Sequence, residues 1–534
     1  MRTAQTLFVG ALLMASANAF AGGYLVNTNQ NAAFGRNLSQ EAMIDIVGTY
    51  ANPAGIAFLT PGWHFALSNQ SAFQTRTAES WFVDPVAGPF TVGIVNGERN
   101  TAATKKYKGT ATAPFIPSFD LAYVKDKWSV AVHFGIVGGG GKCEFENGLG
   151  SFESKVAMLP SVLNTITRNN NVRGYSMETY MRGRQYYFGG QVNGTYKVLD
   201  NLSVALGVRA VYASCNYYGY VRNMQAVLAD GSQVPVADYL RPVATQMATA
   251  IPQLAPVMTG IASVAGDVNL NCDQTGWGVT PIIGIDWKIN DQWNVAAKYE
   301  FRTTLRLKNE SGESASGSAL AQLDEYADGK EVRADIPAIL YLGVQYSPIK
   351  QLRFNVGGHV YFDKQATQYN HKEDELAGPG WEVLAGAEYD VCDWATISAG
   401  WQTTHYGLGD NSKFVSDMSF ACNSNSVGLG ARFRVHKNVA IDVSYFKTFY
   451  QHYNKYQADY NNVKQNFGGL LGGVKQSVEQ VAGAIAQQNP ADPRLATLAD
   501  LGQSMNSLAT ANTAGNDYLH RTNDVIGLGV VLNF

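Results

Sequence analysis

The residues of this sequence best suited to bind a small molecule are basic side chains in stretches of alternating polarity. Arg209, Lys298 and Arg302 each share one face of such a stretch with other polar residues. A guanidinium or ammonium group on that face can pair with a carboxylate through a charge-assisted hydrogen bond. The alternative is that these charges pair within the protein, for which Glu300 and Glu41 are available. The spacing leaves both interpretations open.

Catalytic chemistry is not indicated. The sequence contains no G-x-S-x-G, H-E-x-x-H or P-loop motif, and its 8 His are scattered. No CxxC pair and no Cys/His cluster with metal-ligand spacing occurs. We therefore expect no enzyme, no metal and no cofactor.

The 5 cysteines are too few for a disulfide framework in a chain of 534 residues. Cys215 and Cys272 bracket one long insertion, and a bridge between them would close it. The alternative is that both are free thiols. Because the number of cysteines is odd, at least one thiol has no intramolecular partner.

The N-terminus carries the signs of export. Arg2 supplies a positive charge, residues 7–17 form a short apolar stretch, and an A-x-A cleavage sequence ends at Ala21. The stretch is too short to span a bilayer. A signal peptide of residues 1–21 is therefore predicted, or one that ends at Ala19.

The composition points to an exported β protein. Only 16% of residues are charged, whereas 54 are Gly and 28 are Tyr. No apolar run of about 18 residues follows the signal, which excludes membrane-spanning helices. The net charge of −3 offers no basic surface for nucleic acid. A large secreted β protein or a membrane barrel remains.

Many stretches alternate apolar and polar residues as the strands of a transmembrane β-barrel do, clearly so at 202–213, 293–308 and 352–363. Six short polar turns each join two such stretches, at about 125–127, 199–201, 290–292, 348–350, 390–393 and 436–438. Tryptophans lie beside these turns, where an interfacial aromatic belt is expected: Trp128, Trp287, Trp293 and Trp394.

The six turns join twelve strands, and one strand before them (62–76) and one after them (517–534) make fourteen. We therefore predict an all-β fold, a fourteen-stranded antiparallel transmembrane barrel over residues 62–534, with both ends on the short-turn, periplasmic side. The last strand ends in Phe534, which resembles the signal read by the outer-membrane assembly machinery.

The segment before the barrel, residues 22–61, does not alternate. It contains Gly35-Arg36 and later Asn52-Pro53-Ala54-Gly55. It resembles the N-terminal hatch of the long-chain fatty-acid and aromatic-hydrocarbon transporters of Gram-negative outer membranes. The resemblance covers nearly the whole chain and includes Gly276-Trp277-Gly278 and Asp335-Ile336-Pro337. It implies that residues 22–61 plug the barrel, with Gly35, Arg36, Asn52, Pro53, Ala54 and Gly55 as hatch residues.

A run of four glycines, Gly138, Gly139, Gly140 and Gly141, follows the third alternating stretch. Glycine in a strand weakens pairing and marks bends. In the family an inward kink of the third strand opens a gap in the wall, so the resemblance implies a lateral gate here. The alternative is that these glycines begin the next extracellular loop.

Three long insertions have helical periodicity: 152–166, 240–261 and 467–485. Such helices either pack on one another over the mouth or also leave an apolar groove that captures ligand. In the second case, the ligand contacts in 240–261 would be Met247, Ile251, Leu254 and Met258.

The function implied by the resemblance is passive uptake of long-chain fatty acids or similar hydrophobic compounds through the outer membrane. The extracellular loops would capture the ligand, which would pass the hatch and leave sideways into the membrane. The alternatives are a transporter of aromatic or other apolar compounds, or a surface barrel that acts as an adhesin or scaffold. We expect a monomer whose partners are the hydrophobic molecule, membrane lipids and the assembly machinery.

Overall fold

The computed structural model describes residues 26–82, 90, 92–250, 266–311, 324–408, 415–419 and 421–534, without the side chains at 244, 247, 248, 250 and 466–470. The predicted signal peptide therefore lies outside the described residues, as do Ile251, Leu254 and Met258. Among the helices in the described part of the chain, none is long and apolar enough to cross a membrane.

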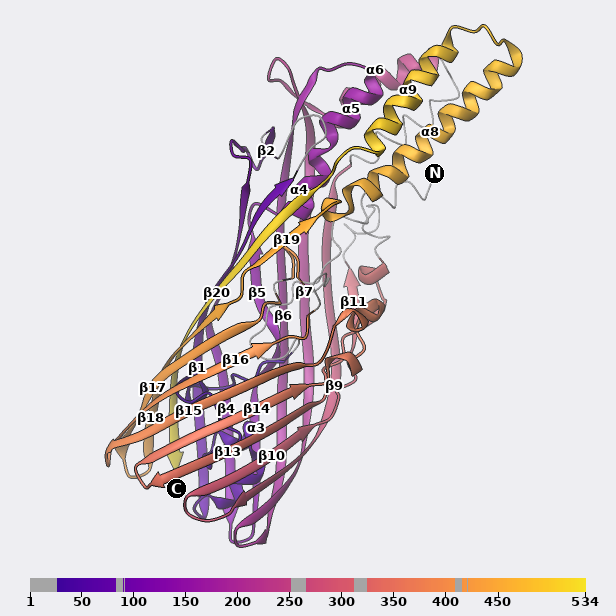
Figure 1. Ribbon diagram of the computed structural model, residues 1–534. Helices are drawn as coiled ribbons and strands as arrows, with labels where there is room; N and C mark the ends of the chain where they lie inside the picture. The colour runs from indigo at the N-terminus through magenta and orange to yellow at the C-terminus, as the bar shows by residue number, and fades with distance from the viewer. Residues whose placement is uncertain are drawn as a thin grey trace.

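Fourteen strands form a closed antiparallel barrel (Figure 1), as the sequence predicted. Each strand pairs with the next, and the last pairs with the first over its whole length. The strands are β1 (Gly62–Phe82), β4 (Lys105–Lys125), β5 (Trp128–Phe145), β6 (Val172–Leu199), β7 (Leu202–Leu228), β9 (Val268–Lys288), β10 (Trp293–Glu300), β13 (Ile339–Ile349), β14 (Leu352–Tyr361), β15 (Gly380–Cys392), β16 (Ala395–His405), β17 (Ser424–His436), β18 (Val439–Tyr450) and β20 (Gly515–Asn533).

Short strands pair beside these, mostly near the mouth: β2 (Gly93–Val95), β3 (Glu98–Arg99), β8 (Gln233–Pro235), β11 (Arg306–Ser311), β12 (Glu331–Arg333) and β19 (Tyr453–Gln457).

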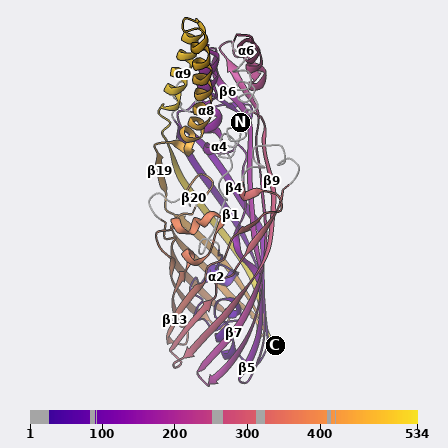
Figure 2. The ribbon, with the colours of Figure 1, turned by 90° about the vertical axis from the view of Figure 1, so that its right-hand side faces the viewer.

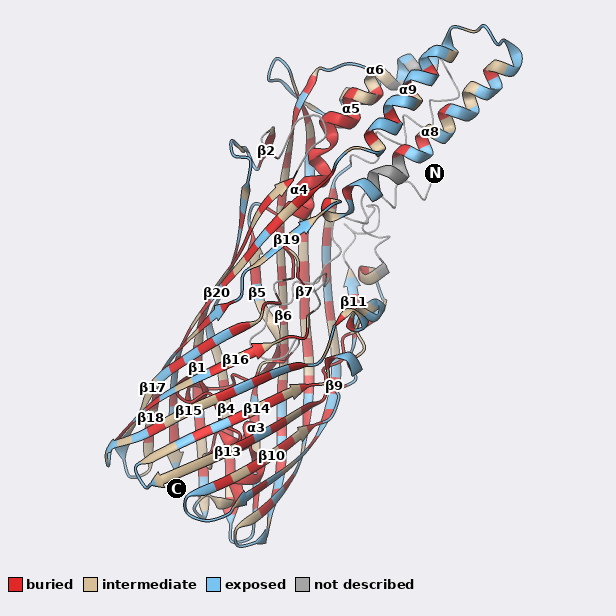
Figure 3. Ribbon diagram, viewed as in Figure 1, coloured by how far each residue is buried: buried red, intermediate tan, exposed pale blue. Residues whose placement is uncertain are grey.

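All six predicted turns join paired strands at one end of the barrel. At the same end, Trp63 and Phe534 exchange backbone hydrogen bonds of 2.9 and 2.8 Å, which close the barrel. Along each strand exposed and buried residues alternate (Figure 3), because successive side chains point to opposite faces. The outward residues are apolar and include Leu206, which is 70% exposed, and a belt of tryptophans beside the turns. This surface is suited to lipid contact.

The wall is uneven in height. β6 and β7 have 28 and 27 residues, whereas β10 has 8 and β14 has 10. A tilted strand needs about 9–11 residues to cross a bilayer. The wall formed by the long strands therefore rises well beyond the rest at the end away from the short turns (Figure 1).

Helices lie over this raised mouth: α4 (Gly150–Ala157), α5 (Leu159–Thr167), α6 (Val236–Ala250), α8 (Val463–Gln488) and α9 (Arg494–Ala509). Short segments of 3-10 helix occur at Asp324–Tyr326, Asp363–Gln365, Tyr369–Glu375 and Tyr460–Asn462. α5 packs on α9, and α8 packs on α9. The predicted helices in 152–166 and 467–485 are thus present, and they contact one another through α9 rather than directly.

The base of this helical cover contains buried charge. Lys155 in α4 is almost fully buried, and burial lowers the pKa of its ammonium group to about 7. Asp417 partly opposes that shift and accepts a 2.8 Å hydrogen bond from the Ser151 backbone N–H, at the start of α4.

The N-terminal segment, residues 26–61, lies inside the barrel near the short-turn end (Figure 2). It contains α2 (Ala32–Arg36), α3 (Gly48–Ala51) and the 3-10 helix η1 (Pro53–Phe58). α2 packs against β16, β17, β18, β20 and β1, whereas η1 packs against β4, β5, β6, β7 and β9. The segment therefore contacts the inner face on opposite sides of the barrel.

The disulfide that the sequence left open is absent, because Cys215 and Cys272 are both free thiols. They lie on the neighbouring strands β7 and β9, but Cys215 is opposite Gln274 and Cys272 is opposite Tyr217. The two thiols are thus diagonal rather than directly paired.

Candidate functional site

The Asn-Pro-Ala-Gly sequence fixes the N-terminal segment to the inner wall. The Asn52 side chain donates to the Asp286 carboxylate of β9 and accepts a 3.2 Å bond from the Gly55 backbone. Pro53 and Ala54 expose backbone carbonyls that accept hydrogen bonds from Thr195 and Ser203 at 2.9 and 2.6 Å. A Cβ at Gly55 would lie 2.6 Å from the Asn52 amide nitrogen. These predicted hatch residues form one connected turn.

Gly35 and Arg36 make the contact on the opposite wall. A Cβ at Gly35 would lie 2.7 Å from the Ser444 hydroxyl, so only glycine allows this approach. Arg36 is buried between carboxylates: it pairs with Glu388 of β15, and its Nε lies 3.3 Å from Asp442 of β18.

A third attachment joins the segment to β14 and β15. The Glu41 carboxylate lies 2.8 Å from the His359 ring, whose other nitrogen lies 2.8 Å from Glu382. Tyr361 donates a 2.6 Å hydrogen bond to the same Glu382 carboxylate. All of these side chains are buried. Sequence reasoning missed His359 and Glu382, since only the strand register brings them beside Glu41.

Arg209 and Lys298, two of the predicted ligand-binding cations, point into the lumen as expected. Arg209 makes two hydrogen bonds to Glu300, of 2.7 and 2.8 Å, and Lys298 makes one of 2.7 Å. Lys298 also donates to the Tyr50 backbone carbonyl at 2.8 Å, and both cations lie over the Tyr50 ring. The structure therefore shows the alternative interpretation, in which both cations pair within the protein with Glu300.

The third predicted cation, Arg302, does not face the lumen. Its side chain is 46% exposed and donates to the Gln365 backbone carbonyl. The prediction assumed unbroken alternation through 293–308, but β10 ends at Glu300 and only the single Thr303–Ile336 bridge forms before β11 begins at Arg306. The irregular residues between these strands reset the alternation, so that Leu305 is buried and Arg306 is exposed.

The predicted apolar groove in 240–261 falls mostly outside the described residues. Met247 belongs to α6, but its side chain is not described. Within the described part, Leu240 of the same helix is buried in the hydrophobic core beneath the helical cover.

Gly138, Gly139, Gly140 and Gly141 lie within β5, which continues to Phe145, so they do not begin a loop. The register with β6 shifts twice here, between Ile136 and Gly141. Gly139 and Gly141 have positive φ angles of 88° and 68°. A Cβ at Gly139 would also lie 2.5 Å from the Gln185 carbonyl oxygen of β6. The strand is therefore bent at these glycines.

On its other edge, β5 leaves its neighbour β4. The two strands pair from Lys125–Trp128 to Phe119–Phe134 and again at Thr110–Glu144, and no ladder joins the described residues between these points. The residues of β4 on this stretch include Pro114 and Pro117, which have no N–H to donate to a ladder. Those prolines are the sequence signal that could have located the interruption.

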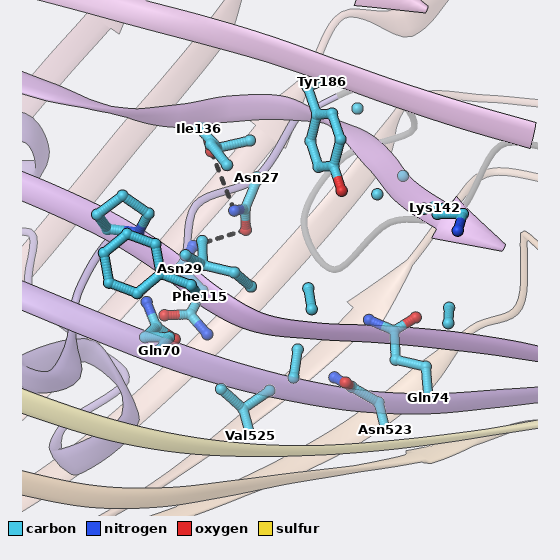
Figure 4. A pocket seen from close by; sticks show the side chains of 18 of the residues that line it. Asn27, Asn29, Gln70, Gln74, Phe115, Ile136, Lys142, Tyr186, Asn523 and Val525 are labelled. Atoms are coloured by element: carbon cyan, nitrogen blue, oxygen red, sulfur yellow. Dashed lines mark hydrogen bonds between the residues drawn. The ribbon is translucent and has the colours of Figure 1, made fainter. Parts of the chain in front are cut away.

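A pocket of about 300 Å³ occupies this interruption (Figure 4). Its lining includes inward residues such as Gln70 and Asn523, and also Phe115, which is 70% exposed on the outer surface. Tyr186 and Phe188 of β6 line it as well. Because residues of both faces meet there, the pocket crosses the wall.

The start of the N-terminal segment closes the inner side of this pocket. The Asn27 backbone N–H donates to the Val137 carbonyl at 2.9 Å, and its side chain donates to the Ile136 carbonyl at 3.1 Å. Gln30 donates to the same Ile136 carbonyl at 3.0 Å. The bent part of β5 is thus hydrogen-bonded to the N-terminal segment in place of β4.

A closed barrel of fourteen strands with an apolar outer surface and aromatic residues beside its short turns is a transmembrane β-barrel. That architecture defines the class of the protein.

The family follows from sequence comparison. Residues 187–488 match the model of the family described as outer membrane protein transport protein (OMPP1/FadL/TodX). The match covers more than half of the 534 residues, and the chain belongs to this family. The predicted resemblance is thereby confirmed, and membership places the chain among transport channels rather than enzymes.

One solved structure supports the fold. A FadL homologue from Pseudomonas aeruginosa is similar at 14% identity and a TM-score of 0.58, over 96% of this chain and 100% of that chain. The toluene transporter TodX of Pseudomonas putida also matches, at 12% identity and a TM-score of 0.49, over 97% and 100% of the two chains. No curated protein matches the chain in sequence.

Proposed function

We propose that this protein is a passive outer-membrane uptake channel for long-chain fatty acids or similar hydrophobic molecules. The extracellular loops capture the molecule, and it leaves sideways through the wall between β4 and β5. The observation that carries this proposal is the pocket at the strand interruption, because residues of the lumen and of the outer surface both line it.

Energetics favour a sideways exit for apolar cargo. Each methylene group transferred into water costs about 0.8 kcal/mol, so a long alkyl chain released into the periplasm would lose most of its binding energy. An opening at the level of the bilayer avoids that transfer. The N-terminal segment supports this route, since as a plug it closes the direct path to the short-turn end.

The orientation follows from the same proposal. The short turns, the N-terminal segment and Phe534 lie on the periplasmic side, and the helical cover faces outside. The channel acts as a monomer, and its last strand is recognised by the outer-membrane assembly machinery through Phe534.

The test is uptake of labelled oleate by a deletion strain that carries plasmid copies of the protein. Ala113→Trp places an indole in the pocket, whereas the control Ala210→Trp places it on the lipid-facing side of β7, where Ala210 is exposed. We expect uptake to fall severalfold in the first variant and to stay unchanged in the second.

Equal uptake in the two variants would contradict sideways release. Unchanged oleate uptake in the deletion strain itself would remove the fatty-acid substrate, and labelled toluene then tests the aromatic alternative. Loss of cell adhesion without any transport defect would favour the adhesin alternative.

A further inference from the structure

Two arginines face each other on the inner wall above the pocket. Arg76 of β1 and Arg521 of β20 are direct cross-strand partners. Their exposed fractions are only 1% and 4%. Like charges placed directly opposite each other in a sheet repel, so the pair opposes folding unless something of opposite charge offsets it.

Among the described residues, no carboxylate pairs with Arg76. In the described part of the chain, its Nε and Nη2 atoms have no hydrogen-bond partner. The ionisable groups that act on it most strongly are Cys143, Arg521, Tyr450 and Cys422, none of which is a carboxylate. A buried cation without a counter-charge is strongly unfavourable, which makes this position exceptional.

Three other buried cations of the lumen show the contrast. Each lies within salt-bridge distance of one or two buried carboxylates: Arg36 with Glu388 and Asp442, and Arg209 and Lys298 with Glu300. Among the described residues, no such ion pair forms with Arg76.

The arginine pair lies at one end of the pocket in the wall. The next inward pair along the same two strands is Gln74 and Asn523, and both line the pocket. They lie side by side at the end of the pocket away from Gln70 (Figure 4). One step along each strand, about 7 Å, leads from them to the arginines.

Gln74 connects the pocket to the pair. Its amide oxygen accepts a 2.8 Å hydrogen bond from Arg521 Nη2. A neutral amide oxygen thus occupies a position that also suits a carboxylate oxygen. A guanidinium binds a carboxylate oxygen more strongly than a neutral amide oxygen. Lys142 also lines the pocket, but its charge is already compensated, because its ammonium group lies 2.6 Å from the Glu144 carboxylate.

We infer that Arg76 and Arg521 bind the carboxylate head group of the transported molecule, which displaces the Gln74 amide while the alkyl chain lies in the pocket. This inference rests on the proposed function and deepens it. It assigns the substrate class as long-chain carboxylates rather than uncharged hydrocarbons.

The test compares probes of equal chain length on the purified full-length protein in a neutral detergent. Palmitate and hexadecanol each displace a fluorescent fatty acid, and inorganic phosphate serves as the head-group-only probe. We expect palmitate to bind at least about tenfold more tightly than hexadecanol, since a hydrogen bond to a charged group contributes roughly that factor or more.

In Arg76→Gln and in Arg521→Gln, the preference for palmitate should fall below about threefold, while hexadecanol affinity stays unchanged. The control is Arg173→Gln, because Arg173 is exposed on β6 and away from the pocket. Folding of each variant is checked by heat-modifiable migration of the barrel on a gel. Removal of an uncompensated charge need not destabilise the barrel.

Three results would overturn the inference: no preference for palmitate in the wild type, a preference that persists in Arg76→Gln, or competition by phosphate as effective as that by palmitate. The third would identify a small-anion site. If palmitate and hexadecanol bind equally and both are taken up, the channel function stands and only the head-group site fails. If neither probe binds or enters cells, the proposed function itself fails.

Discussion

Glu300 pairs with two fully buried cations, Arg209 and Lys298, so its replacement by Gln should be costly. The substitution keeps the volume and one acceptor oxygen but leaves Arg209 and Lys298 without their shared counter-charge. Breaking a buried pair in this way costs about 3–5 kcal/mol. Glu41 also acts on Lys298 and offsets part of the loss, so we expect a decrease of about 3 kcal/mol in the free energy of unfolding.

The substitution should also weaken the attachment of the N-terminal segment, because Lys298 donates to the Tyr50 backbone carbonyl. The assay is urea unfolding in lipid vesicles, followed by tryptophan fluorescence, together with conductance in a planar bilayer. The matched control is Glu331→Gln, whose partner Arg306 lies 3.7 Å away and where both side chains are about 60% exposed. A surface pair contributes less than about 1 kcal/mol. Equal losses in the two variants, with no rise in conductance for Glu300→Gln, would refute the reasoning.

Two further predictions concern the helical cover and the bent strand. Because burial lowers the pKa of Lys155 to about 7, the unfolded cover binds a proton that the folded cover releases, and its stability should rise with pH from about 7 to 10. Lys155→Met should abolish that rise, as measured by proteolysis of the loops; a slope that remains would assign it to Asp417 or another group. In Gly139→Ala, an alanine must adopt a positive φ angle and its Cβ lies 2.5 Å from a backbone oxygen, so the thermal unfolding temperature should fall. Gly190→Ala should leave this temperature unchanged, because the space around its Cβ is open. Equal unfolding temperatures would show that β5 can relax around the added methyl group.

The barrel could be predicted from sequence because its signals are local. Alternation along a strand and a short polar turn each depend on fewer than about twelve neighbouring residues. The turns near Asp126 and Asp200 needed no knowledge of distant partners, and counting such turns gave the number of strands. The Asn52-Pro53 turn was recognised for the same reason.

The parts that could not be predicted depend on register or on a break in periodicity. Arg302 was assigned to the lumen because nothing in its neighbourhood shows that β10 ends at Glu300. Arg76 and Arg521 are separated by most of the chain, so only barrel closure places them opposite each other. The thiols of Cys215 and Cys272 show the same limit, since a shift of two residues in register decides whether they meet.

The attachments of the N-terminal segment bear on how a passive channel can release its cargo. To leave the lumen, the segment would have to separate Arg36 from Glu388, Glu41 from His359 and Asn52 from Asp286. Each separation leaves a buried charge or polar group without its partner, at about 1–5 kcal/mol apiece. Passive binding of a hydrophobic molecule does not readily supply the summed free energy of these separations. Passage through the wall needs only a rearrangement around the pocket, such as the displacement of Gln74. The strength of the lumen contacts therefore supports the proposed exit through the pocket between β4 and β5.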